Sequence, residues 1–226
     1  MFWTVLGEVL PAGLGAAVSP MMIVATTILA TLKGGVRKVF TFGLGELVAL
    51  GGVSVAAVFV AHGAQVASEP SRSTGGSALR LILGLLLWYL AWKTFRDRPT
   101  QGEEPSAVKR LNALDGMSSG KVFSLGFGMG FLNLKNLPLA VSVATAVTQT
   151  GAGTTLSVIG MLIFAALGCS LVVAPAVIVL AAPERSERVL SRLRKFMVEN
   201  NTAIMMVLYL LLGASLIGKT LGPLLG

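Results

Sequence analysis

Charge is scarce in this chain: Asp, Glu, Lys and Arg make up 12% of its 226 residues, whereas soluble domains carry about 25%. Hydrophobic residues account for 54% of the sequence, and the mean hydropathy is +0.80. A composition this apolar excludes an ordinary soluble domain and predicts a polytopic membrane protein. At about 20 apolar residues per span plus loops, the length allows one membrane domain of roughly six spans.

Cysteine and histidine occur once each, as Cys169 and His62. A single cysteine cannot form an intrachain disulfide, and the sequence has no cluster of His, Cys and carboxylate residues that would bind a metal. It also has no Ser–His pair in a suitable context and no GxxxxGK[ST] phosphate loop. We therefore expect no metal, no cofactor and no enzymatic activity.

Apolar runs at about 2–32, 40–62, 79–95, 122–149, 154–181 and 202–222 predict six transmembrane helices. Most basic residues fall in the connections after the first, third and fifth runs. The positive-inside rule places these three connections in the cytoplasm and both termini outside. We expect a multi-pass plasma-membrane protein whose net charge of +8 reflects this orientation and not nucleic-acid binding.

The polar stretch at 97–120 contains proline and glycine, and predicts a cytoplasmic linker between two halves, 1–96 and 121–226. Within the second half, residues 184–199 predict an amphipathic helix on the cytoplasmic surface. Its apolar face would carry Val189, Leu193, Phe196 and Met197. This helix could lie against anionic lipid, or it could be an ordinary charged connector.

The first apolar run is long enough to reach roughly 46 Å as a continuous helix, whereas the hydrocarbon core is about 30 Å thick. Its middle reads GLGAAVSP (13–20), and the middle of the similarly long fourth run reads GFGMGFLNLKNLP (126–138). Ser19 is a good N-cap residue with Pro20 at the first helical position, and Asn136 could cap a helix whose first turn contains Pro138. Each run is therefore predicted to split into two half-helices, although glycine and proline could also merely kink it.

With three spans in each half, the second half is inverted relative to the first. Interrupted helices at matching positions of two inverted halves indicate a binding site in transporters. We therefore predict an all-α integral membrane protein. Its six transmembrane helices would form two inverted three-helix repeats, with helices 1 and 4 broken near the midplane.

Lys135 lies inside the fourth apolar run, where a cation costs roughly 2.5–3.5 kcal/mol on insertion scales. Two helix N-termini, the ammonium group and the amides of Asn133 and Asn136 would together suit an anion. Glu46 is the second buried charge, and it could pair with Lys135 as a structural clamp or as a switch. The predicted substrate-binding residues are Lys135, Asn133, Asn136, Ser19, Pro20, Pro138 and Glu46.

These features resemble the LysE exporter superfamily, and within it the actinobacterial GAP/Sap-like proteins, which address peptidoglycolipids and sulfolipids. The resemblance rests on the Ser19-Pro20 break, the polar linker after three spans and the N-x-K motif that opens the fourth run. Leu134 stands where the family's usual N-P-K motif has proline. The resemblance implies a six-span secondary exporter that forms a homodimer.

The same resemblance implies transport of an anionic cell-envelope lipid or glycolipid, such as a lipid-linked saccharide, across the plasma membrane. Membrane lipids would be its other partners. One alternative is a LysE-type exporter of amino acids or small ions. A second alternative is a membrane subunit that assists envelope-lipid assembly without transporting anything.

Overall fold

Helices make up almost all of the chain that the computed structural model describes, namely residues 1–67, 74–97 and 116–225. This part contains no strand. The helices are α1 (Phe2–Ala17), α2 (Pro20–Thr31), α3 (Gly35–Ala67), α4 (Thr74–Arg96), α6 (Ser119–Phe131), α7 (Asn136–Gln149), α8 (Thr154–Gly168), α9 (Ser170–Ala181), α10 (Pro183–Glu199) and α11 (Asn201–Leu225). All six predicted apolar runs are helical, which confirms the all-α prediction for this part of the chain.

Most of the predicted linker at 97–120 lies outside the described residues. Its last residues belong to the next helix, because Ser118 is the N-cap of α6 and its hydroxyl accepts from the amide of Lys121 at 3.5 Å. The division of the chain into two halves at this linker stays a prediction. Four basic residues of the predicted connections also lie outside the described residues, namely Arg72, Arg98, Lys109 and Arg110.

The first and fourth apolar runs are broken helices, as predicted. α1 meets α2 at 61°, and α6 meets α7 at 65°. Pro20 is the first residue of α2. The N–H of a first helical residue has no partner within the helix, so the N–H that proline lacks costs no helical hydrogen bond. Residues 132–135 connect α6 to α7 without continuing the helix. The α-helix is interrupted at both bends, so these are breaks and not kinks of a continuous helix.

A third break separates α8 from α9 at Cys169, with a bend of 50°. The run at 154–181 is predicted from the sequence as one continuous span, and that prediction misses the break because no proline stands at it. Pro175 lies inside α9, and Pro11 lies inside α1 without interrupting it. Proline positions alone therefore do not locate the breaks in this chain.

Two described helices, α3 and α11, are long and apolar enough to cross a membrane individually. Counting each bent pair as one span gives up to five candidates among the described residues. α4 is helical where the third span was predicted but is not among these candidates. The apolar helices are compatible with a membrane protein, and the count of six spans stays a prediction.

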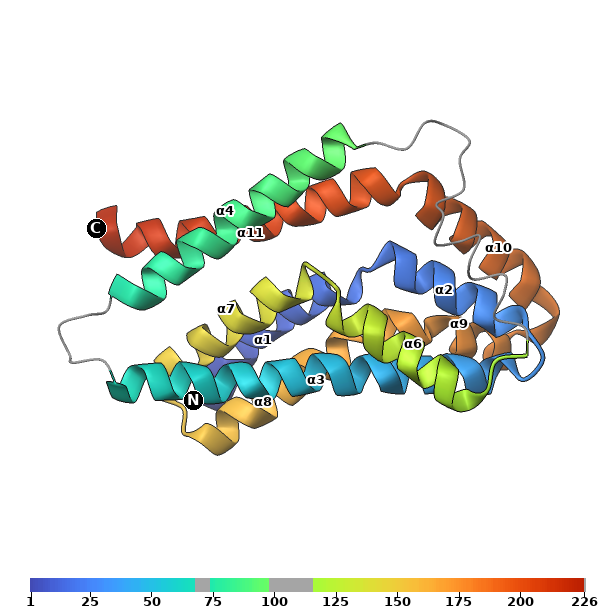
Figure 1. Ribbon diagram of the computed structural model, residues 1–226, viewed down its shortest axis with the longest axis horizontal. Coiled ribbons are helices and arrows are strands. Elements are labelled where there is room, and N and C mark those ends of the chain that lie inside the picture. The colour runs from blue at the N-terminus through green and yellow to red at the C-terminus, as the bar shows by residue number, and fades with distance from the viewer. Residues whose placement is uncertain (68–73, 98–115, 226) are drawn as a thin grey trace.

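The helices pack in two groups (Figure 1). α4 and α11 lie side by side along one edge, and Trp88 of α4 donates to the carbonyl of Leu210 in α11 at 3.3 Å. α3 runs along the opposite edge and packs against α6, α7, α8 and α9. α1, α2 and α7 lie between these two edges.

Three apolar clusters follow from this packing. One contains Val9, Leu139 and Phe164 and joins α1, α3, α7 and α8. The second contains Leu29, Val122 and Val172 and joins α2, α3, α6, α9 and α10. The third lies between α4 and α11. Each of the first two clusters thus contains one half of every broken helix, so the breaks lie between them.

α3 and α6 approach closely because glycines face each other across their contact. A Cβ atom added at Gly126 would stand 2.1 Å from the carbonyl oxygen of Phe42, and one added at Gly45 would stand 2.2 Å from that of Phe123. No side chain fits in either space. Gly45 and Gly126 therefore permit the close packing of these two helices.

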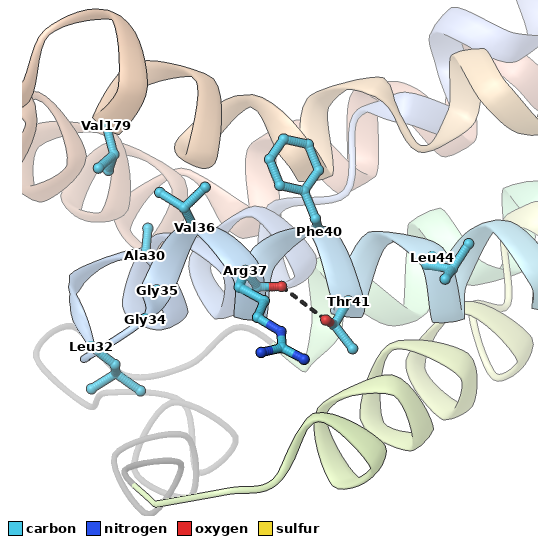
Figure 2. Close-up of a pocket in the computed structure, with 10 residues that line it drawn as sticks. All are labelled: Ala30, Leu32, Gly34, Gly35, Val36, Arg37, Phe40, Thr41, Leu44 and Val179. Carbon is cyan, nitrogen blue, oxygen red and sulfur yellow. Dashed lines mark hydrogen bonds between the residues drawn. The ribbon is translucent and has the colours of Figure 1, made fainter.

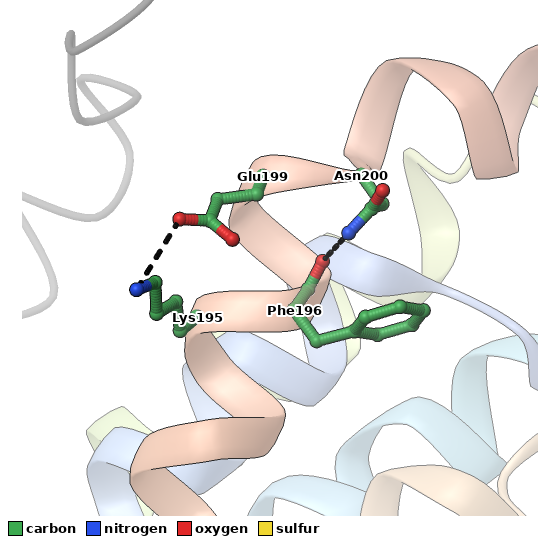
Figure 3. A network of polar contacts seen from close by, with 4 residues as sticks. All are labelled: Lys195, Phe196, Glu199 and Asn200. Atoms are coloured by element: carbon green, nitrogen blue, oxygen red, sulfur yellow. Dashed lines mark hydrogen bonds and ion pairs between the residues drawn. The ribbon is translucent and has the colours of Figure 1, made fainter.

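α10 is the predicted amphipathic helix, but its apolar side chains divide between two directions. Leu190 is buried against the second apolar cluster and Met197 packs on that cluster, whereas Val189 and Phe196 are exposed. At the end of the helix, Asn200 donates to the carbonyl of Phe196 at 2.9 Å, and Lys195 pairs with Glu199 at 3.8 Å (Figure 3). The same carbonyl also accepts from the backbone amide of Asn200 at 3.0 Å, where α10 ends and α11 begins.

Candidate functional site

The two predicted breaks touch each other. Asn133, which follows α6, donates from Nδ2 to the hydroxyl oxygen of Ser19 at 2.9 Å, and the same amide lies 3.8 Å from the sulfur of Met22. Ser19 occupies the N-cap position of α2, as predicted, but its side chain makes no capping bond to that helix. Its hydroxyl instead joins the two breaks, which brings residues more than 100 positions apart into direct contact.

Lys135 is fully buried, and its ammonium group donates to three oxygens. The acceptors are the carbonyls of Gly15 at 3.1 Å and Ala16 at 2.5 Å, and Oδ1 of Asn136 at 3.2 Å. In a continuous helix the carbonyl of Ala16 would accept from residue 20, but residue 20 is proline and has no N–H. Lys135 therefore supplies the donor that Pro20 lacks.

These contacts pair the broken helices head to tail. Lys135 is the N-cap of α7 and binds the last carbonyls of α1, while Asn133 follows α6 and binds the N-cap of α2. A helix carries partial negative charge at its C-terminus and partial positive charge at its N-terminus. The ammonium group thus faces the partly negative end of a helix. The net positive charge of the site is therefore smaller than in the predicted arrangement of two helix N-termini and an unpaired lysine.

The helix start predicted at Asn136 is displaced by one residue. Lys135 is the N-cap, and Asn136 is the first residue of α7, so the capping role predicted for Asn136 is wrong. The Asn136 side chain turns to Lys135 instead, and its buried Nδ2 has no partner among the described residues. Pro138 lies buried in the first turn of α7, as predicted, where a missing N–H costs no helical bond.

Glu46 also lies at this level of the molecule, on α3, fully buried. The structure brings it near Lys135, yet no hydrogen bond joins them, and neither carboxylate oxygen has a hydrogen-bond partner among the described residues. Lys135 and Glu46 therefore interact only through space, and the predicted pair is not a hydrogen-bonded clamp. Lys135 is held by the end of α1 instead.

A groove of about 650 Å³ opens beside the two breaks. Ser19, Pro20 and Asn133 line it at the breaks, and α4 and α11 form its opposite wall through Thr94, Met205 and Tyr209. Asn201 and Ser124 add polar groups, and methionines 21, 22 and 129 add flexible apolar surface. The lining is therefore amphiphilic. Lys135, Asn136, Pro138 and Glu46 lie behind this lining, not on it.

A larger hollow of about 840 Å³ lies away from the breaks, at the turn between α2 and α3 (Figure 2). Gly34 makes this turn with φ of +69°, a conformation that favours glycine. Among the described residues that line the hollow, Arg37 is the charged one, while Phe40 and Leu44 line it with exposed apolar side chains. None of the predicted site residues contributes to this hollow, so the groove at the breaks is the better candidate site.

Sequence reasoning missed the far wall of the groove. Thr94, Asn201, Met205 and Tyr209 come from helices that carry no break, and no motif marks them. Only Thr94 and Asn201 carry a signal in the sequence, as polar residues near the end of α4 and at the start of α11. Only the packing of α4 and α11 against the broken helices identifies them as site residues.

Comparison with known proteins identifies a protein family. No curated protein and no solved structure matches the chain. The model of one protein family, described as "Sap, sulfolipid-1-addressing protein", matches residues 9–222. That match covers both breaks, the groove and nearly the whole length of the chain. The chain therefore belongs to the sulfolipid-1-addressing protein family.

Proposed function

We propose that this protein is a secondary transporter that moves an anionic cell-envelope lipid or glycolipid out across the plasma membrane. The family description refers to the addressing of a sulfolipid, which is an anionic amphiphile. This supports a role in the export or assembly of envelope lipids. The protein would act as a carrier and not as an enzyme, with six spans and both termini outside, and as a homodimer, as the LysE resemblance implies.

The observation that carries the proposal is the amphiphilic groove between the two breaks and the α4–α11 pair. Its polar residues, including Ser19, Asn133 and Asn201, can hydrogen-bond a headgroup, and its methionines can adapt to varied apolar chains. A volume of about 650 Å³ suits a headgroup with the first part of its chains. The rest of the lipid would stay in the bilayer, which requires a groove open to the side.

The position of the groove supports a cytoplasmic opening in this conformation. It extends from the breaks to Thr94 near the end of α4 and to Asn201 at the start of α11. These helix ends adjoin the basic segments that the positive-inside rule assigns to the cytoplasm. Lipid from the inner leaflet would therefore enter first, and α4 and α11 would have to move for it to leave outward.

The pairing of the helices supports an inverted repeat. α1 packs on α8 and α6 packs on α3, which are equivalent pairs if the first half of the chain is related to the second by a two-fold axis. α4 pairs with α11, its own equivalent under the same operation. Alternating access in such proteins is a rocking of one part against another around a fixed site.

Filling the groove tests the proposal. A Cβ atom added at Gly128, which lines the groove, would meet nothing within 4 Å, so Gly128→Phe fills it without displacing the backbone. Gly52 on α3 is equally open and lies elsewhere, so Gly52→Phe is the matched control. Each variant is returned to a deletion strain, and surface-exposed envelope lipids are measured by mass spectrometry after metabolic labelling.

We expect Gly128→Phe to retain a labelled lipid inside the cell, as the deletion does, while Gly52→Phe restores its exposure. An unchanged surface lipid profile in the deletion strain would refute lipid transport. Full complementation by Gly128→Phe would instead favour the accessory-subunit alternative, because an assisting subunit does not need the groove. Growth inhibition of the deletion strain by a dipeptide, with normal surface lipids, would favour the amino-acid exporter.

A further inference from the structure

Glu46 is a buried carboxyl group that the lipid groove does not use. It lies on α3 between Phe42 and Leu50, which belong to the two apolar clusters on either side of the breaks. On its other side is Gly130 of α6, where an added Cβ would stand 3.1 Å from both Cα and Cγ of Glu46. The glycine makes room for the glutamate side chain in the interior of the molecule.

Two titratable groups act on Glu46 from the elements that pack on α3, which are α2, α6, α7, α8 and α9. They are the ammonium group of Lys135 and the thiol of Cys169. The ammonium group already donates to three oxygens and gives Glu46 no hydrogen bond. The Cys169 thiol is only a weak donor, and it is the one donor near the carboxyl besides the ammonium group among the described residues. An ionised carboxylate with so little hydrogen bonding is strongly disfavoured in such an interior, so this arrangement suits the neutral acid.

We propose that Glu46 is a proton-binding site, and that its ionisation competes with the end of α1 for Lys135. With the proton bound, the acid is neutral and Lys135 holds the carbonyls of Gly15 and Ala16, as observed. When the proton leaves to water, a carboxylate remains and attracts the ammonium group. Lys135 stands at the junction before α7, so its long side chain can move without unfolding a helix.

A movement of Lys135 would affect the groove through the junction between α1 and α2. Once Lys135 turns to Glu46, the carbonyls of Gly15 and Ala16 lose their donor, and the angle between α1 and α2 is no longer fixed by that contact. Ser19 and Pro20, which line the groove, belong to this same junction. The proton would thus act on the proposed lipid pathway, and this part of the inference rests on the proposed function.

Infrared spectroscopy of the purified full-length protein tests the proton site. A buried protonated carboxyl gives a C=O stretching band apart from that of carboxylates. Exposed carboxyls are ionised above their ordinary pKa of about 4. At mildly acidic pH above that value we expect such a band in the wild-type protein, its loss as the pH is raised, and its absence over the same pH range in Glu46→Gln. Glu199→Gln, which alters an exposed carboxyl on α10, should keep the band. A wild-type protein without the band, or a band that persists in Glu46→Gln, overturns the proposal.

Hydrogen exchange tests the link to Lys135. With intrinsic rates corrected for pH, amides of residues 17–23 should exchange several-fold faster in the wild-type protein at high pH than at low pH. They should stay slow at both pH values in Glu46→Gln, whose side chain cannot ionise. A peptide from α8 serves as the internal control. Equal exchange in both proteins at high pH would overturn the competition for Lys135.

Neither measurement involves lipid, so the proton site and the proposed function fail separately. A titrating Glu46 band together with a normal lipid profile in the deletion strain would support the proton site and refute lipid transport. A lipid defect in the Gly128→Phe variant without a Glu46 band would support lipid transport and refute the proton site.

Discussion

At Lys135 the ammonium group has three protons and three acceptors, so its hydrogen-bonding capacity is filled within the protein. A substrate anion would have to displace a carbonyl or the Asn136 amide before it could bind there. The groove beside Lys135 offers the hydroxyl of Ser19 and the amide of Asn133 without such a displacement. Lys135 therefore holds the shape of the site in this conformation.

Replacement of Lys135 should destabilise the protein. Lys135→Met keeps much of the side-chain length but leaves the carbonyls of Gly15 and Ala16 without their donor, and each unsatisfied buried group costs about 1–3 kcal/mol. We expect a clearly lower melting temperature in detergent, together with loss of lipid export. Lys121→Met, at an exposed position on α6, is the control and should melt like the wild-type protein. Equal melting of both variants would show that the Lys135 bonds are not needed for the break.

Among the elements, the α3–α6 contact depends most closely on residue size. Its backbones approach where Gly45 and Gly126 have no side chain, and such contacts supply the van der Waals packing that holds membrane helices together. Glu46 follows Gly45 directly in the sequence. The contact therefore also fixes where the buried carboxyl lies relative to the end of α6.

A methyl group at Gly126 should separate these helices. Gly126→Ala places a Cβ against the backbone carbonyl of Phe42, which cannot rotate away as a side chain could, and overpacking of this kind costs about 1–3 kcal/mol or more. Gly120→Ala lies on the same helix, where an added Cβ meets nothing within 4 Å. Thermal unfolding should show a lower midpoint for the first variant and no loss for the second. Two equally stable variants would contradict the close packing.

The exposed face of α10 has the character of a helix that rests on anionic lipid. Val189 and Phe196 are exposed, and Arg185, Arg188 and Arg192 are exposed on the same side of the helix. Each arginine near an anionic surface contributes about 1 kcal/mol. Replacing the three arginines with glutamine should reduce the anionic phospholipid that co-purifies with the protein, as measured by lipid mass spectrometry.

Replacing the same three arginines with lysine keeps the charge and should keep the lipid. An unchanged lipid content in the glutamine variant would identify α10 as a connector whose charge serves only solubility. The alternative left open by the sequence, surface anchor or connector, is decided by this comparison.

Across the whole molecule, buried polar residues lie at one level between the first and second apolar clusters. Ser19, Glu46, Lys135 and Asn136 are all buried at this level, and the halves of the broken helices diverge from it. The α4–α11 pair has its own apolar cluster and forms one wall of the groove. We therefore expect it to move as a unit against the rest of the helices.

A cross-link across the groove should stop that movement. Met21→Cys and Met205→Cys place thiols on opposite walls, and Cys169→Ala removes the native thiol. A bifunctional thiol reagent should then abolish lipid export, with recovery when a cleavable reagent is reduced. Trp88→Cys with Leu210→Cys links α4 to α11 within the moving unit and should leave export intact. Export that survives the first cross-link would show that these walls do not separate.

The sequence predicts the helices and two of the three breaks because hydrophobic run length, Pro20 and the Lys135 region are local signals. It also predicts that Ser19, Asn133, Asn136 and Lys135 gather at those breaks. It does not predict the partner of Lys135, because backbone carbonyls occur at every residue and leave no mark in the sequence. The α8–α9 break and the groove wall formed by α4 and α11 depend on tertiary packing, which no local sequence pattern specifies.

The bond between Lys135 and the carbonyl of Ala16 makes the lysine and Pro20 complementary, since the lysine provides a donor that the proline removes. Pro20→Ala would restore an amide at position 20 and relieve the need for the ammonium group. A strain disabled by Lys135→Met should therefore regain part of its function through second-site revertants at position 20. Among relatives of this chain, the two residues are expected to be gained and lost together.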